Sequence, residues 1–330
     1  MHRDRLLRRK NRLARFVSLG LIGALAMLWP AASAGAAPTP NAPGVVEVYV
    51  YSPAMAKNIL LRVIPSRSSG SPTLYLLNGA AGGAEAPWDW LEHTDVVNFM
   101  SDKDTNVVIP IGGRESYYTD WIADDPVLGR NKWRTFLTQE LPPIIDSMFS
   151  TNGRNAIAGL SMSGTAVLAL AESAPGLYRS VASYSGCAGT SDPIGRAYVT
   201  AVVEGRGGGN VANMWGPPNS PLWVENDALI NAEKLRGTAL YISAGNGLAG
   251  PHDNLAGRNV GGDPVFLAQQ LVVSGTIEAA INQCTQNLRA RLDGLGIPAQ
   301  YNFRPAGTHS WDYWQDDLHT SWPLIANSLR

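Results

Sequence analysis

The apolar residues of this chain fall into short, nearly continuous runs that alternate with longer amphipathic stretches. The first two runs, 45–52 and 59–65, predict an antiparallel pair of strands. The later runs are apolar at almost every position and tend to end in Gly, as strands buried on both faces of a parallel sheet do. These later runs are 73–79, 106–113, 155–159, 180–186, 239–247 and 299–303.

Helical stretches lie between these runs, most clearly at 88–100, 131–148, 161–175, 264–293 and 312–329. Strands that alternate with helices predict an α/β protein with a mostly parallel central sheet and helices on both faces. The segment 205–221 is rich in Gly, Pro and Asn. It is interpreted as a long loop at the sheet edge, which serves either as a lid or as plain surface.

One strand-to-helix junction carries a candidate nucleophile. Ser161 follows the run 155–159 within the hexapeptide GLSMSG and precedes a run of helix formers. This context fits the nucleophile elbow of α/β-hydrolases, except that Ser163 replaces the second glycine of G-x-S-x-G. The backbone N–H of Met162 would then stabilise an oxyanion at the helix N-terminus. The alternative is that Ser161 is only a helix N-cap.

A general base for this serine must come from the five histidines of the chain. His309 lies directly after the last predicted strand and before the last predicted helix, which is where this architecture supplies its histidine. His252 is a weaker candidate, and His93 and His319 fall within predicted helices. The sequence therefore predicts His309 as the base.

The carboxylate that would orient this histidine is not determined by the residues alone. Asp253, Asp263 and Glu278 all lie between the strand at 239–244 and His309. A loop after a strand is the usual place for the acid, which favours Asp253. A solvated surface carboxylate is the competing interpretation for each of the three.

The first forty residues differ from the rest of the chain. Seven basic residues and one acidic residue are followed by an apolar stretch and then by small residues. This layout predicts a secretory signal peptide over 1–34, a linker over 35–44 and one catalytic domain over 45–330. An uncleaved membrane anchor is the alternative.

The whole chain has a net charge of −1, so the exported part would carry about −7, which argues against nucleic acid as a partner.

The chain has two cysteines, Cys187 and Cys284. An even number of cysteines in an exported protein favours a disulfide over two buried thiols. The mature histidines and cysteines show no spacing typical of metal ligands, so no metal and no cofactor are predicted.

A series of motifs, in order, resembles the secreted mycolyltransferases of the antigen 85 type, which are α/β-hydrolases. The motifs lie at 74–79, 109–121, 132–142, 159–163, 214–235, 245–247 and 307–314, and together they span most of 45–325. The resemblance implies an enzyme that moves mycolyl groups between hydroxyls at the cell envelope. Its donor would be a glycolipid such as trehalose monomycolate. The acceptor would be trehalose monomycolate, cell-wall arabinan or another hydroxyl.

Carried over residue by residue, the resemblance assigns the nucleophile to Ser161, the base to His309 and the acid to Glu278, in place of Asp253. It also places the second oxyanion N–H at Ala80. A secreted carboxylesterase that uses water is the first alternative function, and a non-enzymatic wall or adhesion protein is the second.

The sugar-contacting positions depart from the mycobacterial pattern. Asn78 stands where that pattern has an Asp, and Ala81 where it has an Arg, as in the branch that transfers corynomycolate. Asn78 is predicted to bind a sugar hydroxyl. Trp311, next to His309, is predicted to line the substrate site. A disulfide between Cys187 and Cys284 also fits this branch and would tie the helix of Glu278 to the loop after 180–185.

Overall fold

The computed structural model describes residues 44–84 and 88–330. The predicted signal peptide and residues 35–43 of the predicted linker lie outside the described residues. The catalytic domain predicted from residue 45 onward lies almost wholly within them.

The core of the fold is one eight-stranded sheet in the order β1-β2-β4-β3-β5-β6-β7-β8. The pairs β1–β2 and β2–β4 are antiparallel, and every later pair is parallel. This confirms the predicted mostly parallel sheet with an antiparallel opening. The strands are β1 (Val46–Ser52), β2 (Lys57–Ile64), β3 (Thr73–Leu77), β4 (Asn106–Ile111), β5 (Asn155–Leu160), β6 (Tyr178–Tyr184), β7 (Ala239–Ala244) and β8 (Gln300–Phe303).

Residues in the central strands face two separate hydrophobic clusters in turn. Tyr75 and Leu77 of β3 belong to one cluster, whereas Leu74 and Leu76 belong to the other. All five residues of β3 are buried, because helices cover both faces of the sheet. This double cover explains why the central strands read as unbroken apolar runs.

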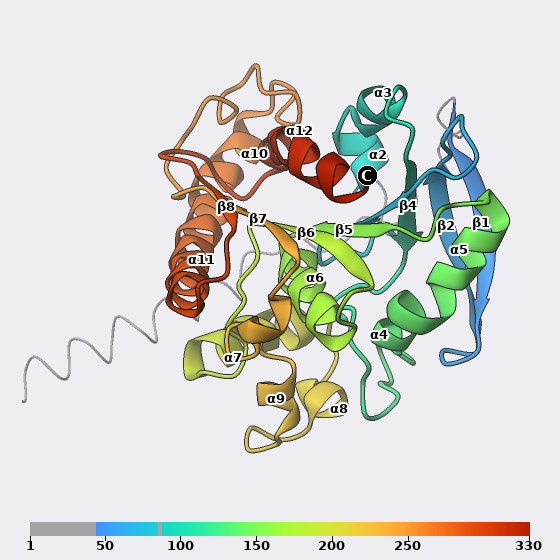
Figure 1. The fold of residues 1–330 in the computed structure, drawn as a ribbon. Coiled ribbons are helices and arrows are strands. Elements are labelled where there is room, and N and C mark those ends of the chain that lie inside the picture. The colour runs from blue at the N-terminus through green and yellow to red at the C-terminus, as the bar shows by residue number, and fades with distance from the viewer. Residues whose placement is uncertain (1–43, 85–87) are drawn as a thin grey trace, which may run out of the picture.

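Helices pack on the two faces as Figure 1 shows. One face carries α2 (Trp90–His93), α3 (Val96–Met100) and α12 (Trp311–Ser328). The other carries α4 (Trp133–Thr135), a π-helical turn η1 (Phe136–Glu140), α5 (Leu141–Phe149) and α6 (Met162–Ser173). The predicted helix 88–100 is thus two short helices. They separate at Thr94, whose hydroxyl bonds the carbonyl of Trp90 and accepts the N–H of Val96.

The segment after β6 adds a smaller helical layer below α6. It contains α7 (Pro193–Thr200), η2 (Ala201–Arg206), α8 (Val211–Trp215), α9 (Leu222–Glu225) and η3 (Ala232–Leu235). The predicted loop 205–221 therefore holds a helix, and its Met214 and Trp215 are buried in the core.

A long helix precedes β8 and runs through α10 (Pro264–Gln269), η4 (Gln270–Ser274) and α11 (Gly275–Leu295). By length and hydropathy alone Pro264–Leu295 passes as a candidate membrane span. However, α11 contacts β7 and buries Glu278 completely, so in this fold it is a helix packed on the sheet.

The strands β3, β5, β6, β7 and β8 are mutually parallel, so the segments that follow them meet at one edge of the sheet. Those segments begin at Asn78, Ser161, Ser185, Gly245 and Arg304. The fold thereby brings together residues that are far apart in the sequence, as ligand sites of α/β sheets require.

Candidate active site

Ser161 occupies a strained turn between β5 and α6. Its φ is 56° and its ψ −123°, a conformation that costs free energy in a non-glycine residue. Small neighbours make the turn possible, since a Cβ at residue 159 would lie 2.6 Å from Ser163 Oγ. A Cβ at residue 164 would lie 2.7 Å from the carbonyl oxygen of Tyr184. The geometry is that of a nucleophile elbow.

The serine hydroxyl does not cap the helix. Ser161 is the N-cap residue of α6, yet its side chain accepts no capping hydrogen bond. Its Oγ instead lies 2.8 Å from Nε2 of His309. The interpretation that the Ser161 side chain serves only to cap the helix is therefore wrong. Ser163, which departs from the motif, is fully buried, and its Oγ accepts the N–H of Leu160 at 2.8 Å, so this hydroxyl stabilises the turn.

His309 lies in the loop between β8 and α12, as predicted. Its backbone N–H donates to the carbonyl of Ser274 in η4 at 3.2 Å. Its ring meets the ring of Trp314 edge to face, with 4.8 Å between centroids. The imidazole is only 10% exposed. These contacts hold the ring in place and leave little freedom for it to rotate away from Ser161.

Glu278 lies behind the imidazole and is fully buried. Its Oε2 is 2.7 Å from Nδ1 of His309. Its Oε1 accepts hydrogen bonds from Ser185 Oγ at 2.8 Å and from the backbone N–H of Gly245 at 2.6 Å. Trp314 Nε1 in turn donates to Ser185 Oγ at 3.1 Å. These contacts leave the carboxylate one orientation and compensate for its burial.

The two rival carboxylates have other partners. Asp253 accepts hydrogen bonds from Gln270 and Thr308, both at 2.6 Å, and from the Tyr313 hydroxyl at 2.7 Å. It thus fastens the loop that carries His309 without touching the imidazole. Asp263 is the N-cap of α10, where it accepts two backbone N–H groups.

The other described histidines lie outside this cluster. His252 pairs with Asp316 at 2.7 Å, and His319 with Asp95 at 2.9 Å. His93 is within 2.6 Å of Asn259 Oδ1. None of these contacts involves Ser161.

The predicted oxyanion donors flank the serine. A Cβ at Gly79 would lie 3.7 Å from Ser161 Cβ, so the loop of Ala80 runs beside the nucleophile. Within residues 44–84 and 88–330, neither the Ala80 nor the Met162 amide donates a hydrogen bond. Two free N–H groups beside a serine are what an oxyanion hole needs.

The two predicted sugar contacts are buried. Asn78 is fully buried, its Oδ1 accepting the N–H of Trp90 at 3.3 Å and its Nδ2 lying 3.5 Å from the carbonyl of Pro110. These contacts fix the loop after β3, and the full burial of Asn78 leaves none of its surface exposed to a sugar in this structure.

Trp311 is 5% exposed and stacks on His93, with 5.0 Å between ring centroids. The other face of His93 is covered by Trp88, which is 41% exposed. The aromatic surface available to a ligand on this side is therefore that of Trp88.

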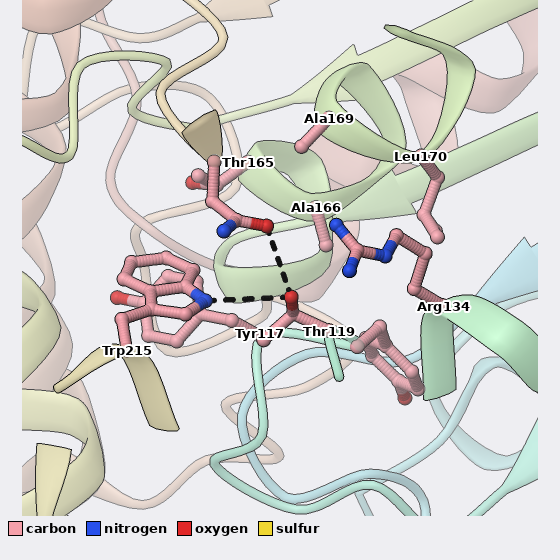
Figure 2. A pocket seen from close by; sticks show the side chains of 10 residues that line it. Tyr117, Thr119, Arg134, Thr165, Ala166, Ala169, Leu170 and Trp215 are labelled. Carbon is pink, nitrogen blue, oxygen red and sulfur yellow. Dashed lines mark hydrogen bonds between the residues drawn. The ribbon is translucent and has the colours of Figure 1, made fainter. Parts of the chain in front are cut away.

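A narrow pocket opens beside α6, one helical turn beyond Met162 (Figure 2). Apolar and aromatic side chains form most of its wall, and Thr119 crosses it with hydrogen bonds to Asn226 and Trp215. The lining residues are Tyr117, Tyr118, Thr119, Arg134, Thr165, Ala166, Ala169, Leu170, Trp215 and Asn226. The backbone N–H of Tyr117 lies 3.4 Å from Met162 Sδ, which places this wall next to the nucleophile turn.

Cys187 and Cys284 form the predicted disulfide, with 5.0 Å between their Cα atoms. Cys187 lies in the loop after β6, and Cys284 lies in α11 six residues beyond Glu278. The bridge therefore joins the helix of the buried carboxylate to the sheet edge.

Ser185, Gly245 and Trp314 hold Glu278 directly or through Ser185. The motifs at 245–247 and 307–314 include Gly245 and Trp314, but no part in holding a carboxylate was expected of any of the three. Ser185 and Gly245 each directly follow a parallel strand. The rule that such positions meet at one edge could have identified these two residues, whereas no pattern linked Trp314 to the carboxylate.

Comparison with known proteins identifies the family of this chain. Residues 52–324 match the profile of the family described as "Putative esterase". The chain is 32% identical to the diacylglycerol acyltransferase/mycolyltransferase Ag85B of Mycobacterium leprae, over 94% of this chain and 93% of that protein. It is also 32% identical to Ag85A of Mycobacterium tuberculosis, over 94% of this chain and 88% of that protein. The crystal structure of MPT51 (FbpC1) from Mycobacterium tuberculosis covers 89% of this chain, with all of its own chain matched, at 23% identity and a TM-score of 0.72.

The match to the MPT51 structure supports the α/β-hydrolase fold. The family profile and the two Ag85 proteins identify the family. They confirm the resemblance drawn from the motifs: the chain belongs to the esterase family and, within it, to the antigen 85 group of acyltransferases.

Proposed function

We propose that this protein is a serine acyltransferase that moves a mycolyl group, of the corynomycolyl type, from one hydroxyl to another. The observation that carries the proposal is the continuous set of contacts from Ser161 through His309 to Glu278, with separations of 2.8 and 2.7 Å. A hydroxyl, an imidazole and a buried carboxylate in this order form a catalytic triad.

In the first half-reaction, Ser161 Oγ attacks the carbonyl carbon of the donor ester while His309 Nε2 takes the serine proton. Glu278 stabilises the imidazolium that forms. The N–H groups of Ala80 and Met162 stabilise the oxyanion, and one such donor is worth about 2.7–4 kcal/mol. The ester bond then breaks, the imidazolium protonates the departing sugar alkoxide, and the acyl group remains on Ser161.

In the second half-reaction, an acceptor hydroxyl replaces the sugar that has left. His309 takes its proton, the acceptor oxygen attacks the acyl carbon, and collapse of the second tetrahedral intermediate returns the proton to Ser161 Oγ. The triad itself does not distinguish this acceptor from water. Transfer therefore depends on binding the acceptor and excluding water.

The proposed donor is a glycolipid such as trehalose monomycolate, and the acceptor is trehalose monomycolate, cell-wall arabinan or another hydroxyl. The names of the relatives Ag85B and Ag85A include mycolyltransferase, which supports this substrate class. The predicted signal peptide over 1–34 would bring the enzyme to the cell envelope.

The test incubates the exported protein with trehalose monomycolate carrying a labelled acyl chain, and identifies the products by mass. A new acylated sugar, absent with Ser161→Ala, is the expected result. A fluorophosphonate probe should label the wild type and leave Ser161→Ala unlabelled. A wild-type protein that neither reacts with the probe nor turns over the donor would contradict the proposal and favour a non-enzymatic wall protein.

Hydrolysis is the second candidate function, because the matching family carries the name esterase. The same incubation separates the two functions. Free mycolic acid as the sole product, unchanged when acceptor sugar is added, would identify a carboxylesterase.

A further inference from the structure

Arg304 begins the segment after β8 and lies five residues before His309. Its guanidinium Nη1 is 2.5 Å from Oδ2 of Asp317, and its Nη2 is 3.6 Å from Oε1 of Glu278. The guanidinium also lies over the ring of Tyr313, 5.2 Å from the centroid. The side chain is only 12% exposed. A buried cation therefore connects the triad carboxylate to a second buried carboxylate.

Asp317 is held firmly in place. It is fully buried on α12, and its Oδ1 accepts hydrogen bonds from the Tyr241 hydroxyl at 3.1 Å and from Asn302 Nδ2 at 3.0 Å. These donors come from β7 and β8, so the carboxyl group that anchors Arg304 is fixed by the sheet itself. Burial raises the pKa of Asp317, and the charge of Arg304 opposes that shift and favours the ionised form.

Arg304 has bonding capacity that Asp317 does not use. Its Nε and Nη2 are buried and have no hydrogen-bond partner among the residues that the structure describes. Leaving such donors unpaired costs free energy, more for a charged group. The Nη2 group faces Glu278 Oε1 just beyond hydrogen-bond distance, so its main effect on Glu278 is electrostatic.

We propose that Arg304, anchored by Asp317, is a positioning residue that sets the charge balance of the Glu278–His309 pair. The inference rests on the proposed triad. The positive charge of Arg304 partly offsets the negative charge of Glu278, so removing either Arg304 or its partner Asp317 should change the pH range over which the Ser161 hydroxyl reacts.

Other ionisable groups surround this network without replacing Arg304. Burial raises the pKa of both Tyr241 and Tyr313, so both phenols stay neutral at physiological pH. Asp253 accepts a hydrogen bond from the Tyr313 hydroxyl at 2.7 Å. The pair formed by His252 and Asp316 lies beyond the same ring.

This arrangement determines the direction in which each substitution should move the pH–rate profile. Arg304→Met removes a positive charge near the imidazolium, so protonation of His309 becomes easier. The acid limb of the rate profile should then move to higher pH by about one unit. Asp317→Asn removes the anion that balances Arg304, so the same limb should move to lower pH. Arg304→Lys retains the charge and should leave the limb close to that of the wild type.

The readout is the rate at which a fluorophosphonate reacts with Ser161, measured from pH 4.5 to 9. This rate needs the triad and requires no knowledge of the natural donor. On the acid limb the Arg304→Met protein, scaled to its own plateau, should react up to about tenfold more slowly than the wild type does at the same pH. Arg289→Met is the matched control, because Arg289 pairs with Asp293 and lies 5.2 Å from the centroid of Tyr301, far along α11 from Glu278.

Opposite displacements of the acid limb in Arg304→Met and Asp317→Asn, with none in Arg289→Met, would support the inference. A purely structural role would lower the plateau rate or the melting temperature and leave the limb in place, which would overturn it. If Arg304→Met does not fold, Asp317→Asn and Arg304→Lys still decide the question. Failure of the wild type to react at all would contradict the proposed triad rather than the role of Arg304.

Discussion

Nδ1 of His309 lies 2.7 Å from Oε2 of Glu278, although Asp253 lies in the loop where such an acid is usually found. Asp253 instead receives hydrogen bonds from four donors of the surrounding loops and helices. The structure thus separates two tasks that the sequence could not: one carboxylate contacts the imidazole, and the other fastens its loop.

This separation predicts different effects for two substitutions. Glu278→Gln keeps the shape of the side chain but removes the charge that stabilises the imidazolium, so kcat/KM should fall by about 10³-fold or more. Asp253→Asn should lower the melting temperature with a much smaller loss of kcat/KM. Steady-state kinetics with an activated ester, together with thermal unfolding, measure both. A larger catalytic loss in Asp253→Asn would reverse the assignment.

A second prediction concerns Trp314, which donates from Nε1 to Ser185 and contacts the His309 ring. Trp314→Phe keeps an aromatic ring but loses this donor. We expect kcat to fall about three- to tenfold, in line with the loss of one hydrogen bond, with KM little changed. Trp322→Phe is the control, because Trp322 is on the same helix but packs on Phe99. Equal kinetics for the two variants would argue against a role for Trp314.

Much of the fold could be predicted from the sequence because strands buried on both faces are apolar at nearly every position. Ser161 and His309 could be predicted for a related reason: each follows a strand that the pattern had located. The break at Thr94 could not be predicted, since a single threonine does not by itself end a helix and only its two side-chain hydrogen bonds reveal the end of α2.

Glu278 illustrates the limit of pattern analysis. It lies inside an amphipathic helix, and nothing in its neighbourhood distinguishes it from a solvated glutamate until the helix is packed on the sheet. The assignment came from the family resemblance. Conversely, Asn78 and Trp311 have side chains suited to sugars, yet both are buried in the structure. Their burial could not be predicted locally, because it depends on contacts between distant segments of the chain.

The disulfide gives a third prediction. Cys187 and Cys284 are 97 residues apart in the sequence, so their bridge restricts the unfolded chain strongly. The double variant Cys187→Ala/Cys284→Ala should lose about 2–5 kcal/mol of unfolding free energy. Denaturant unfolding with and without a reductant measures this, and the double variant should not respond to reductant. A wild type equally stable in both conditions would exclude a stabilising bridge.

The last prediction concerns Glu172, a buried carboxyl on α6 outside the active site. It is 5% exposed and lines a cleft of about 340 Å³ together with Lys234. Its Oε1 has no hydrogen-bond partner among the described residues. Burial raises the pKa of Glu172 to about 9, with the charge of Lys234 opposing the shift and that of Asp227 adding to it.

Because the pKa of Glu172 is higher in the folded state than in the unfolded one, the folded protein binds more protons between pH 4.5 and 9. Stability must therefore fall as pH rises through this window. Glu172→Gln keeps the shape but does not ionise, so the variant should be more stable than the wild type at pH 8 and show a flatter pH dependence. Thermal unfolding at pH 6 and 8.5 measures the difference. Glu225 is an exposed residue of the same cleft, so the control variant Glu225→Gln should show the same pH dependence of stability as the wild type. If Glu172→Gln also showed the wild-type pH dependence, Glu172 would already be ionised in the folded protein at no cost to folding.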